Sequence, residues 1–138
     1  MHTADTAGAA AYDALYASTP PWETESPQPA LREVAGAGLV RGRVLDAGCG
    51  TGEHTLMAAA LGCAATGIDL AQTALARARA KAAQRGLAAR FRHADLLSLT
   101  SVGEHFDVVL DSLVFHGFTG TQRARYAQNL AAVLQPGG

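Results

Sequence analysis

A glycine-rich segment holds the residues of this sequence that are best suited to bind a ligand. It reads Asp46-Ala47-Gly48-Cys49-Gly50-Thr51-Gly52, and it follows a short apolar run at 43–45. Alternate glycines let the backbone turn tightly and approach a ligand closely. A helix that begins after such a turn aims free N–H groups at the same place. The segment therefore predicts a binding loop between a strand and a helix; a turn that only packs the two elements together is the alternative.

A second acidic residue narrows the choice of ligand. Asp69 lies 23 residues after Asp46, where the next strand is expected to end. In nucleotide sites an acidic residue about 20 residues after the loop accepts hydrogen bonds from ribose hydroxyls. The glycine spacing is G-x-G-x-G and not the G-x-G-x-x-G of dinucleotide sites. Asp46 would repel a pyrophosphate and attract an ammonium or sulfonium group. The pattern favours S-adenosylmethionine over NAD.

Alternating elements must position these residues. Apolar runs predict strands at 43–47, 64–68, 89–93 and 106–110, and helical composition predicts helices at 53–61, 71–85 and 121–134. This alternation predicts an α/β fold with a parallel sheet and helices on both faces. Residues 1–40, with short helices near 12–16 and at 31–37, are expected to form a lead-in arm, and residues 41–138 the ligand-binding part.

The composition excludes several classes of protein. The 138 residues are 49% apolar and 17% charged, which fits one globular domain. Eleven basic residues against twelve acidic ones give a net charge of −1, which argues against sequence-independent nucleic-acid binding. No apolar run approaches the roughly 20 residues of a membrane span. Two cysteines and five histidines show no spacing typical of a metal site. We expect a cytoplasmic protein without a metal or a membrane segment.

Five motifs in a fixed order then resemble the class I S-adenosylmethionine-dependent methyltransferases. They are Val44–Gly52, Gly67–Leu70, Ala94–Leu96, Phe106–Asp111 and Leu134–Gly138. The resemblance implies a Rossmann-like sheet with strands in the order 3-2-1-4. It also implies a site for the cofactor S-adenosylmethionine, which methyl transfer converts to S-adenosylhomocysteine.

The resemblance assigns a role to each part of this cofactor site. The loop that contains Ala47, Gly48, Cys49, Gly50 and Gly52 would lie under the amino-acid part of the cofactor, with Asp46 beside it. Asp69, followed by Leu70, would hold the ribose hydroxyls. Asp95 would accept from the adenine amino group, with the Leu96 backbone beside the ring, and Asp111 would border the methionine end.

A narrower resemblance concerns the arm and the segment after the fourth strand. Pro20-Pro21-Trp22-Glu23, Gln28-Pro29 and residues 111–116 are similar to the thiopurine-methyltransferase-like branch, which includes O-methyltransferases of phenolic and quinol-like compounds. Trp22 would be a lid residue, whose indole suits a sulfonium through cation–π attraction. His116 is the candidate base for the acceptor, since it titrates near neutrality. Asp111 is expected to orient the cofactor ammonium.

Two departures from the family pattern stand out. Ala71 occupies a place where a serine often caps the following helix, so that helix is expected to lack a side-chain cap. The family's sheet has seven strands, of which four are encoded, so the chain is expected to be truncated at its C-terminal side. The fourth strand would then be an open edge, able to pair with a partner or a second copy.

Methyl transfer to an oxygen, sulfur or nitrogen of a small aromatic acceptor is the expected function. A cofactor-binding fragment or interaction module without turnover is the first alternative, and an NAD(P)-linked oxidoreductase is the second.

Overall fold

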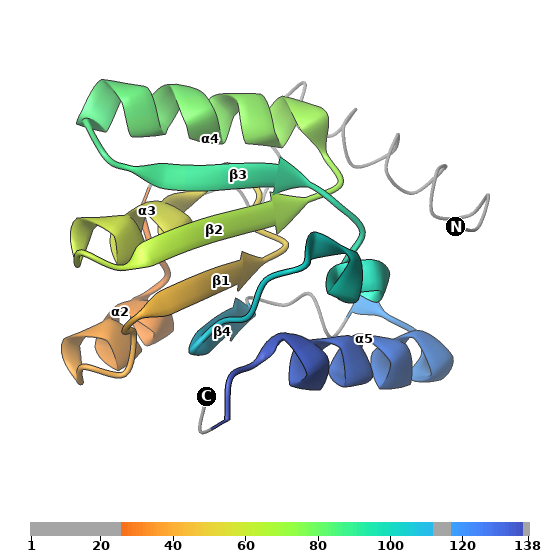
Figure 1. Cartoon of the computed structure of the whole chain (residues 1–138). Helices are drawn as coiled ribbons and strands as arrows, with labels where there is room; N and C mark the ends of the chain where they lie inside the picture. The colour runs from red at the N-terminus through yellow and green to blue at the C-terminus, as the bar shows by residue number, and fades with distance from the viewer. Residues whose placement is uncertain (1–25, 112–116, 137–138) are drawn as a thin grey trace.

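The computed structural model describes residues 26–111 and 117–136, and its centre is a parallel sheet. Within that part of the chain the sheet has four strands in the order β3-β2-β1-β4 (Figure 1). They are β1 (Arg43–Ala47), β2 (Ala64–Asp69), β3 (Ala89–His93) and β4 (Val108–Asp111). The predicted α/β class and the strand order are both confirmed.

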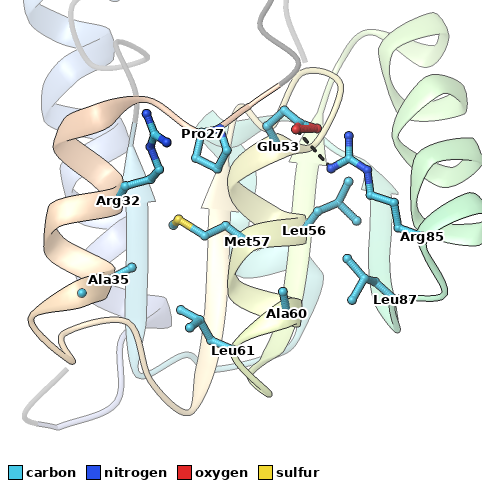
Figure 2. Close-up of a pocket in the computed structure, with 11 residues that line it drawn as sticks. Pro27, Arg32, Ala35, Glu53, Leu56, Met57, Ala60, Leu61, Arg85 and Leu87 are labelled. Atoms are coloured by element: carbon cyan, nitrogen blue, oxygen red, sulfur yellow. Dashed lines mark hydrogen bonds and ion pairs between the residues drawn. The ribbon is translucent and has the colours of Figure 1, made fainter.

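Helices cover the two faces of the sheet. On one face lie α2 (Pro29–Gly36), α3 (Glu53–Ala60) and α4 (Gln72–Arg85), side by side in Figure 2. The other face carries the 3-10 helix η1 (Leu96–Val102) and α5 (Gly120–Val133), which pack on each other (Figure 1). The helix expected near residues 12–16 lies outside the described residues. The helices predicted at 53–61, 71–85 and 121–134 are confirmed to within one residue at each end, and η1 was not predicted.

The burial of each strand explains its composition. The central strands β1 and β2 consist mostly of apolar and small residues and are buried over most of their length. The edge strand β3 alternates instead: Phe91 is buried toward α4, whereas Arg90 and Arg92 are exposed. The core under α5 is built around Leu45, Ile68, Phe106 and Tyr126.

The start of the fourth strand differs from the prediction. β4 begins at Val108, two residues after the expected start, because Phe106 pairs with the chain that leaves α5. The Phe106 N–H donates to the Val133 carbonyl at 2.7 Å, and the Gln135 N–H donates to the Phe106 carbonyl at 2.7 Å. The expectation of an entirely open edge is therefore corrected at this first position, where the chain covers itself.

The start of α4 matches the expectation drawn from its sequence. Ala71 is its N-cap residue and, among the described residues, no side chain caps this helix. The free N–H of Ala71 instead donates to Oδ1 of Asp69 at 2.9 Å. The carboxylate at the end of β2 thus holds the N-cap residue but does not cap the first turn of the helix.

Candidate functional site

Four aspartates lie along the edge of the sheet at which its strands end. Asp69 and Asp111 are the last residues of β2 and β4, Asp46 precedes the last residue of β1, and Asp95 follows β3 by two residues. Ala47 pairs with Ile68 on one side and with Asp111 on the other, so the strand ends are aligned. We call this row of four carboxylates and the adjoining glycine loop (residues 48–52) the carboxyl edge. The predicted acidic residues are thus brought together.

The glycine loop has a backbone that other residues rarely adopt. Gly48, Gly50 and Gly52 have φ of 68°, 55° and 90°, in the left-handed region. A Cβ on Gly52 would lie 2.9 Å from the Ala78 side chain and 2.9 Å from the Phe91 ring. The loop therefore needs glycine at position 52 for its conformation and for its close packing against α4 and β3.

Asp69 holds the loop in place. Its Oδ2 accepts from the Gly50 N–H at 2.8 Å, and its Oδ1 accepts from the Ala71 N–H at 2.9 Å. Each carboxylate oxygen has a second lone pair, so both oxygens can still accept from a ligand hydroxyl. Burial raises the pKa of Asp69, and hydrogen bonds from the backbone N–H groups of Ala71, Gly50 and Leu70 counteract that shift. The residue is suited to the predicted contact with a ribose, and it also orders the loop.

Asp46 is the most deeply buried of the four carboxylates. Its side chain accepts from the Thr55 hydroxyl at 2.7 Å, and the residue is 2% exposed. Burial raises the pKa of Asp46 to about 7; repulsion from Asp69 and Asp111 adds to the shift, and the Thr55 hydrogen bonds oppose it. A cation at this edge would relieve that repulsion. The negatively charged groups at this edge therefore fit a ligand that carries a sulfonium and an ammonium.

The outer two carboxylates have different partners. Asp95 Oδ1 accepts from the Leu97 N–H at 2.8 Å and so caps η1, while its Oδ2 accepts no hydrogen bond from the described residues. Leu96, the first residue of η1, is buried in the core under α5. Asp111 accepts from the Tyr126 hydroxyl at 2.9 Å. Burial raises the pKa of Tyr126, as does the neighbouring Asp111.

Cys49 fills a small space inside the loop. Its side chain is buried, and burial raises the pKa of the thiol, with a further contribution from Asp46. Beneath it, Gly67 of β2 leaves room, since a Cβ there would lie 2.8 Å from the Cys49 sulfur and 2.7 Å from the Thr55 hydroxyl. Cys49 is thus a packed thiol, and Gly67 is required for the loop to sit on β2.

Two of the predicted site residues are not described by the structure, and some residues that contact the site followed no recognisable sequence pattern. Trp22 and His116 lie outside the described residues. The Leu70 carbonyl lies 3.1 Å from Nε2 of His93, at the turn after β2. Thr55 and Tyr126 support the site but were not predicted, and Gly67 was named only as part of a motif. Thr55 and Tyr126 look like ordinary helical residues, and only the pairing of distant elements reveals their roles.

A separate groove lies away from the carboxyl edge. It is about 530 Å³ in volume and runs over α3 between α2 and the end of α4 (Figure 2). Met57, Leu61 and Leu87 give it an apolar floor, with Arg32 and Arg85 at its sides. None of the described site residues predicted above lines it, so it is not the candidate site.

The described residues hold neither a metal site nor a membrane span. Among residues 26–111 and 117–136 no group of His, Cys, Asp and Glu could hold a metal ion. No helix in the same ranges is long and apolar enough to cross a membrane.

Comparison with known proteins identifies the family. Residues 44–138 match a family described as a methyltransferase domain. The 2-heptyl-1-hydroxyquinolin-4(1H)-one methyltransferase of Mycobacteroides abscessus is 38% identical over 122 residues, which are 88% of this chain and 54% of that protein. The chain thus spans about half the length of this curated relative.

Solved structures agree with this match. One, from work on the conversion of a disulfide bond into a thioacetal group during echinomycin biosynthesis, is 46% identical with a TM-score of 0.89, over 93% of this chain and 56% of that one. The magnesium protoporphyrin IX methyltransferase of Synechocystis PCC 6803 with bound SAH is 26% identical with a TM-score of 0.62, over 77% of this chain and 49% of that one. The chain therefore belongs to the methyltransferase domain family, within the class I S-adenosylmethionine-dependent methyltransferases.

Proposed function

We propose that this chain binds S-adenosylmethionine at its carboxyl edge and serves a methyltransferase that acts on a small aromatic acceptor. The observation that carries the proposal is the row of carboxylates around the glycine loop. Repulsion from Asp69 and Asp111 contributes to the raised pKa of Asp46, and a cationic ligand would relieve that repulsion. Membership of the methyltransferase family displaces the alternative of an NAD(P)-linked oxidoreductase.

Each part of the site has a proposed role. The glycine loop and Asp46 take the amino-acid part of the cofactor, and Asp111 orients its ammonium. Asp69 accepts from the ribose hydroxyls with the lone pairs that the backbone leaves open. Asp95 accepts from the adenine amino group through Oδ2, next to the Leu96 backbone.

The residues of the chain contribute mainly by alignment. S-adenosylmethionine, when bound, supplies a methyl group activated by its sulfonium. The transfer is an in-line displacement with a neutral leaving group, so the protein has chiefly to hold the acceptor and the methyl in line. We propose Trp22 as a cover over the sulfonium and His116 as the base that takes the acceptor's proton. The family resemblance supports both roles.

The proposed acceptor is a small aromatic molecule methylated on oxygen, sulfur or nitrogen. A relative named as a methyltransferase of a hydroxyquinolone supports this class. The net charge of −1 supports a small molecule over nucleic acid as the partner. Cys49 and Cys63 are free thiols, which supports a cytoplasmic location. Pairing of a second copy along β4 stays a prediction.

Calorimetric titration with S-adenosylhomocysteine tests the proposal. The chain should bind one equivalent, and Asp69→Ala should weaken binding at least about tenfold. Asp107→Ala is the matched control: its carboxylate also accepts from a backbone N–H, that of Arg43 at 2.8 Å, but at the opposite end of the strands. That variant should keep its affinity.

Three results would count against parts of the proposal. A folded chain that does not bind S-adenosylhomocysteine would overturn the cofactor assignment. Equal affinity in Asp69→Ala and the unsubstituted chain would overturn the ribose contact. Binding without turnover across a panel of phenols, thiols and hydroxyquinolones would favour a cofactor-binding module.

A further inference from the structure

A buried carboxylate joins the first turn of α3 to α4. Glu53 begins α3, and its side chain is only 4% exposed. Its Oε2 lies 2.9 Å from the Lys81 ammonium, and its Oε1 lies 3.1 Å from the Arg85 guanidinium, the contact dashed in Figure 2. Residues 81 and 85 are four apart, so they share one face of α4. Since a buried charge is costly without partners, these two cations keep Glu53 in place.

Lys81 makes a second contact that reaches the glycine loop. Its ammonium donates to the Thr51 hydroxyl at 3.0 Å. Thr51 lies between Gly50 and Gly52 and is 5% exposed. An ammonium has three donors, so Lys81 can serve Thr51 and Glu53 at the same time. One side chain of α4 therefore connects the loop to the helix that follows it.

This contact approaches the loop from a different side than the site residues do. From β2, the Asp69 carboxylate accepts from Gly50 and the Ile68 carbonyl accepts from the Cys49 N–H at 2.9 Å. Lys81 holds the loop from α4 instead. Its ammonium donates to Thr51 and Glu53. Neither of these two contacts involves one of the four aspartates of the carboxyl edge. Lys81 is thus placed to affect the site through the shape of the loop.

We propose that Lys81 is a positioning residue of the cofactor site. By holding the Thr51 side chain, it fixes the backbone between Gly50 and Gly52, which the cofactor's amino-acid part approaches. Glu53 accepts from the same ammonium through its Oε2 and so anchors Lys81 beside the loop. This role rests on the proposed function, because it concerns the affinity of the same site.

Substitution of Lys81 tests the proposal in the whole chain. Lys81→Met should weaken S-adenosylhomocysteine binding about tenfold, as expected for loss of a charged hydrogen bond that orders the loop. The variant should fold, because Arg85 still pairs with Glu53. Arg85→Met is the matched control: it removes the other ion pair of the same carboxylate but leaves the contact between Lys81 and Thr51. Its affinity should be unchanged, and thermal unfolding of both variants measures the cost in stability.

Variants of Thr51 show whether Lys81 acts through the loop. Thr51→Val removes the hydroxyl and should weaken binding as much as Lys81→Met, whereas Thr51→Ser keeps the hydroxyl and should keep the affinity. The double variant Lys81→Met/Thr51→Val should lose less affinity than the sum of the two single losses, because the contact between Lys81 and Thr51 is already absent in each single variant.

The outcomes separate this role from the proposed function. If the unsubstituted chain binds but Lys81→Met and Arg85→Met lose equal affinity, Lys81 acts only through stability and the proposal is overturned. Additive losses in the double variant would overturn it too. A folded, unsubstituted chain without binding would overturn the cofactor assignment and this role with it.

Discussion

The hydroxyl of Tyr126 donates to the carboxylate of Asp111 at 2.9 Å, so α5 is joined directly to the end of β4. The Tyr126 ring is fully buried and meets Phe118 edge-on with centroids 5.1 Å apart. Burial raises the pKa of the phenol, which therefore stays protonated and donating at neutral pH. The helix that follows β4 thus sets the orientation of the carboxylate that we propose for the cofactor ammonium.

Tyr126→Phe should cost about 2 kcal/mol of unfolding free energy, the usual value of a hydrogen bond to a charged group. The ring packing is retained, so the loss reports the hydroxyl alone. Binding of S-adenosylhomocysteine should weaken as well, since Asp111 loses the donor that orients it. Urea unfolding and calorimetric titration at neutral pH measure the two effects. Unchanged values in both would show that Asp111 is held by other contacts.

Gly52→Ala should be far more costly than Gly62→Ala. Both glycines have nearly the same φ, 90° and 87°, so both substitutions strain the backbone by about 1–2 kcal/mol. At Gly52 the new Cβ would also meet Ala78 and Phe91 at 2.9 Å, whereas nothing lies within 4 Å at Gly62. Overpacking should add about 2 kcal/mol at Gly52.

Denaturant unfolding measures the difference in stability between the two glycine variants, which appears as a difference in midpoint when both have the same dependence of unfolding free energy on denaturant concentration. Gly62→Ala is the control for backbone strain alone. Equal midpoints would mean that the loop moves away from α4 without cost, and would contradict the close packing described above.

The features that the sequence predicted correctly are local ones. A strand followed by a glycine turn, and a second strand that ends in an aspartate, are each short segments, so the positions of Asp46, the loop and Asp69 could be predicted without knowledge of their neighbours. The parallel arrangement of the strands follows from the alternation of elements, whereas their order was implied by the family resemblance. Capping of η1 by Asp95 is local as well, but the prediction gave this residue only a ligand role.

The features that the sequence did not predict depend on distant elements. Tyr126 reaches Asp111, and Lys81 reaches Thr51, only after helices pack on the sheet. The start of β4 was misplaced for the same reason, because Phe106 has a strand-like composition but pairs with Leu134 after α5. Such contacts leave no regular spacing in a single sequence.

Asp46 should make the unfolding free energy fall as the pH rises toward neutrality. Its pKa is about 7 in the folded chain and 3.8 ordinarily, so between these values the folded state holds a proton that the unfolded state has released. Stability from this group is therefore greatest near pH 4 and is lost as the pH rises to about 7, by at most roughly 1.4 kcal/mol per pH unit.

Asp46→Asn removes this dependence while keeping an acceptor for the Thr55 hydroxyl. The unfolding free energy of the variant minus that of the unsubstituted chain should grow between about pH 5 and pH 7 and then level. Asp69, whose pKa is also raised, is present in both proteins, and only its repulsion with Asp46 differs between them. Urea unfolding across this range measures the difference. A constant difference would contradict the raised pKa of Asp46.

His54 should have the opposite dependence, because it must be neutral to hold the start of α2. Its Nε2 accepts from the Gln28 N–H at 3.0 Å, just before the first residue of that helix. Burial lowers the pKa of His54 from 6.5, and the neighbouring Glu53 opposes the shift in part. Protonation would place a donor against the Gln28 N–H. Stability from this contact is therefore complete above pH 6.5 and is lost as the pH falls through the lower pKa of the folded state.

His54→Gln should remove this acid sensitivity, since the glutamine carbonyl can still accept from Gln28 but does not titrate in this range. We expect the unsubstituted chain to lose stability relative to the variant as the pH falls below 6.5 and through the lower pKa of the folded state, with faster amide exchange in α2. An NMR titration of the His54 ring gives the direct measurement, with a midpoint below 6.5. A midpoint at or above that value would show that the imidazole carries no buried acceptor role, and α2 would then have to be held by its apolar contacts alone.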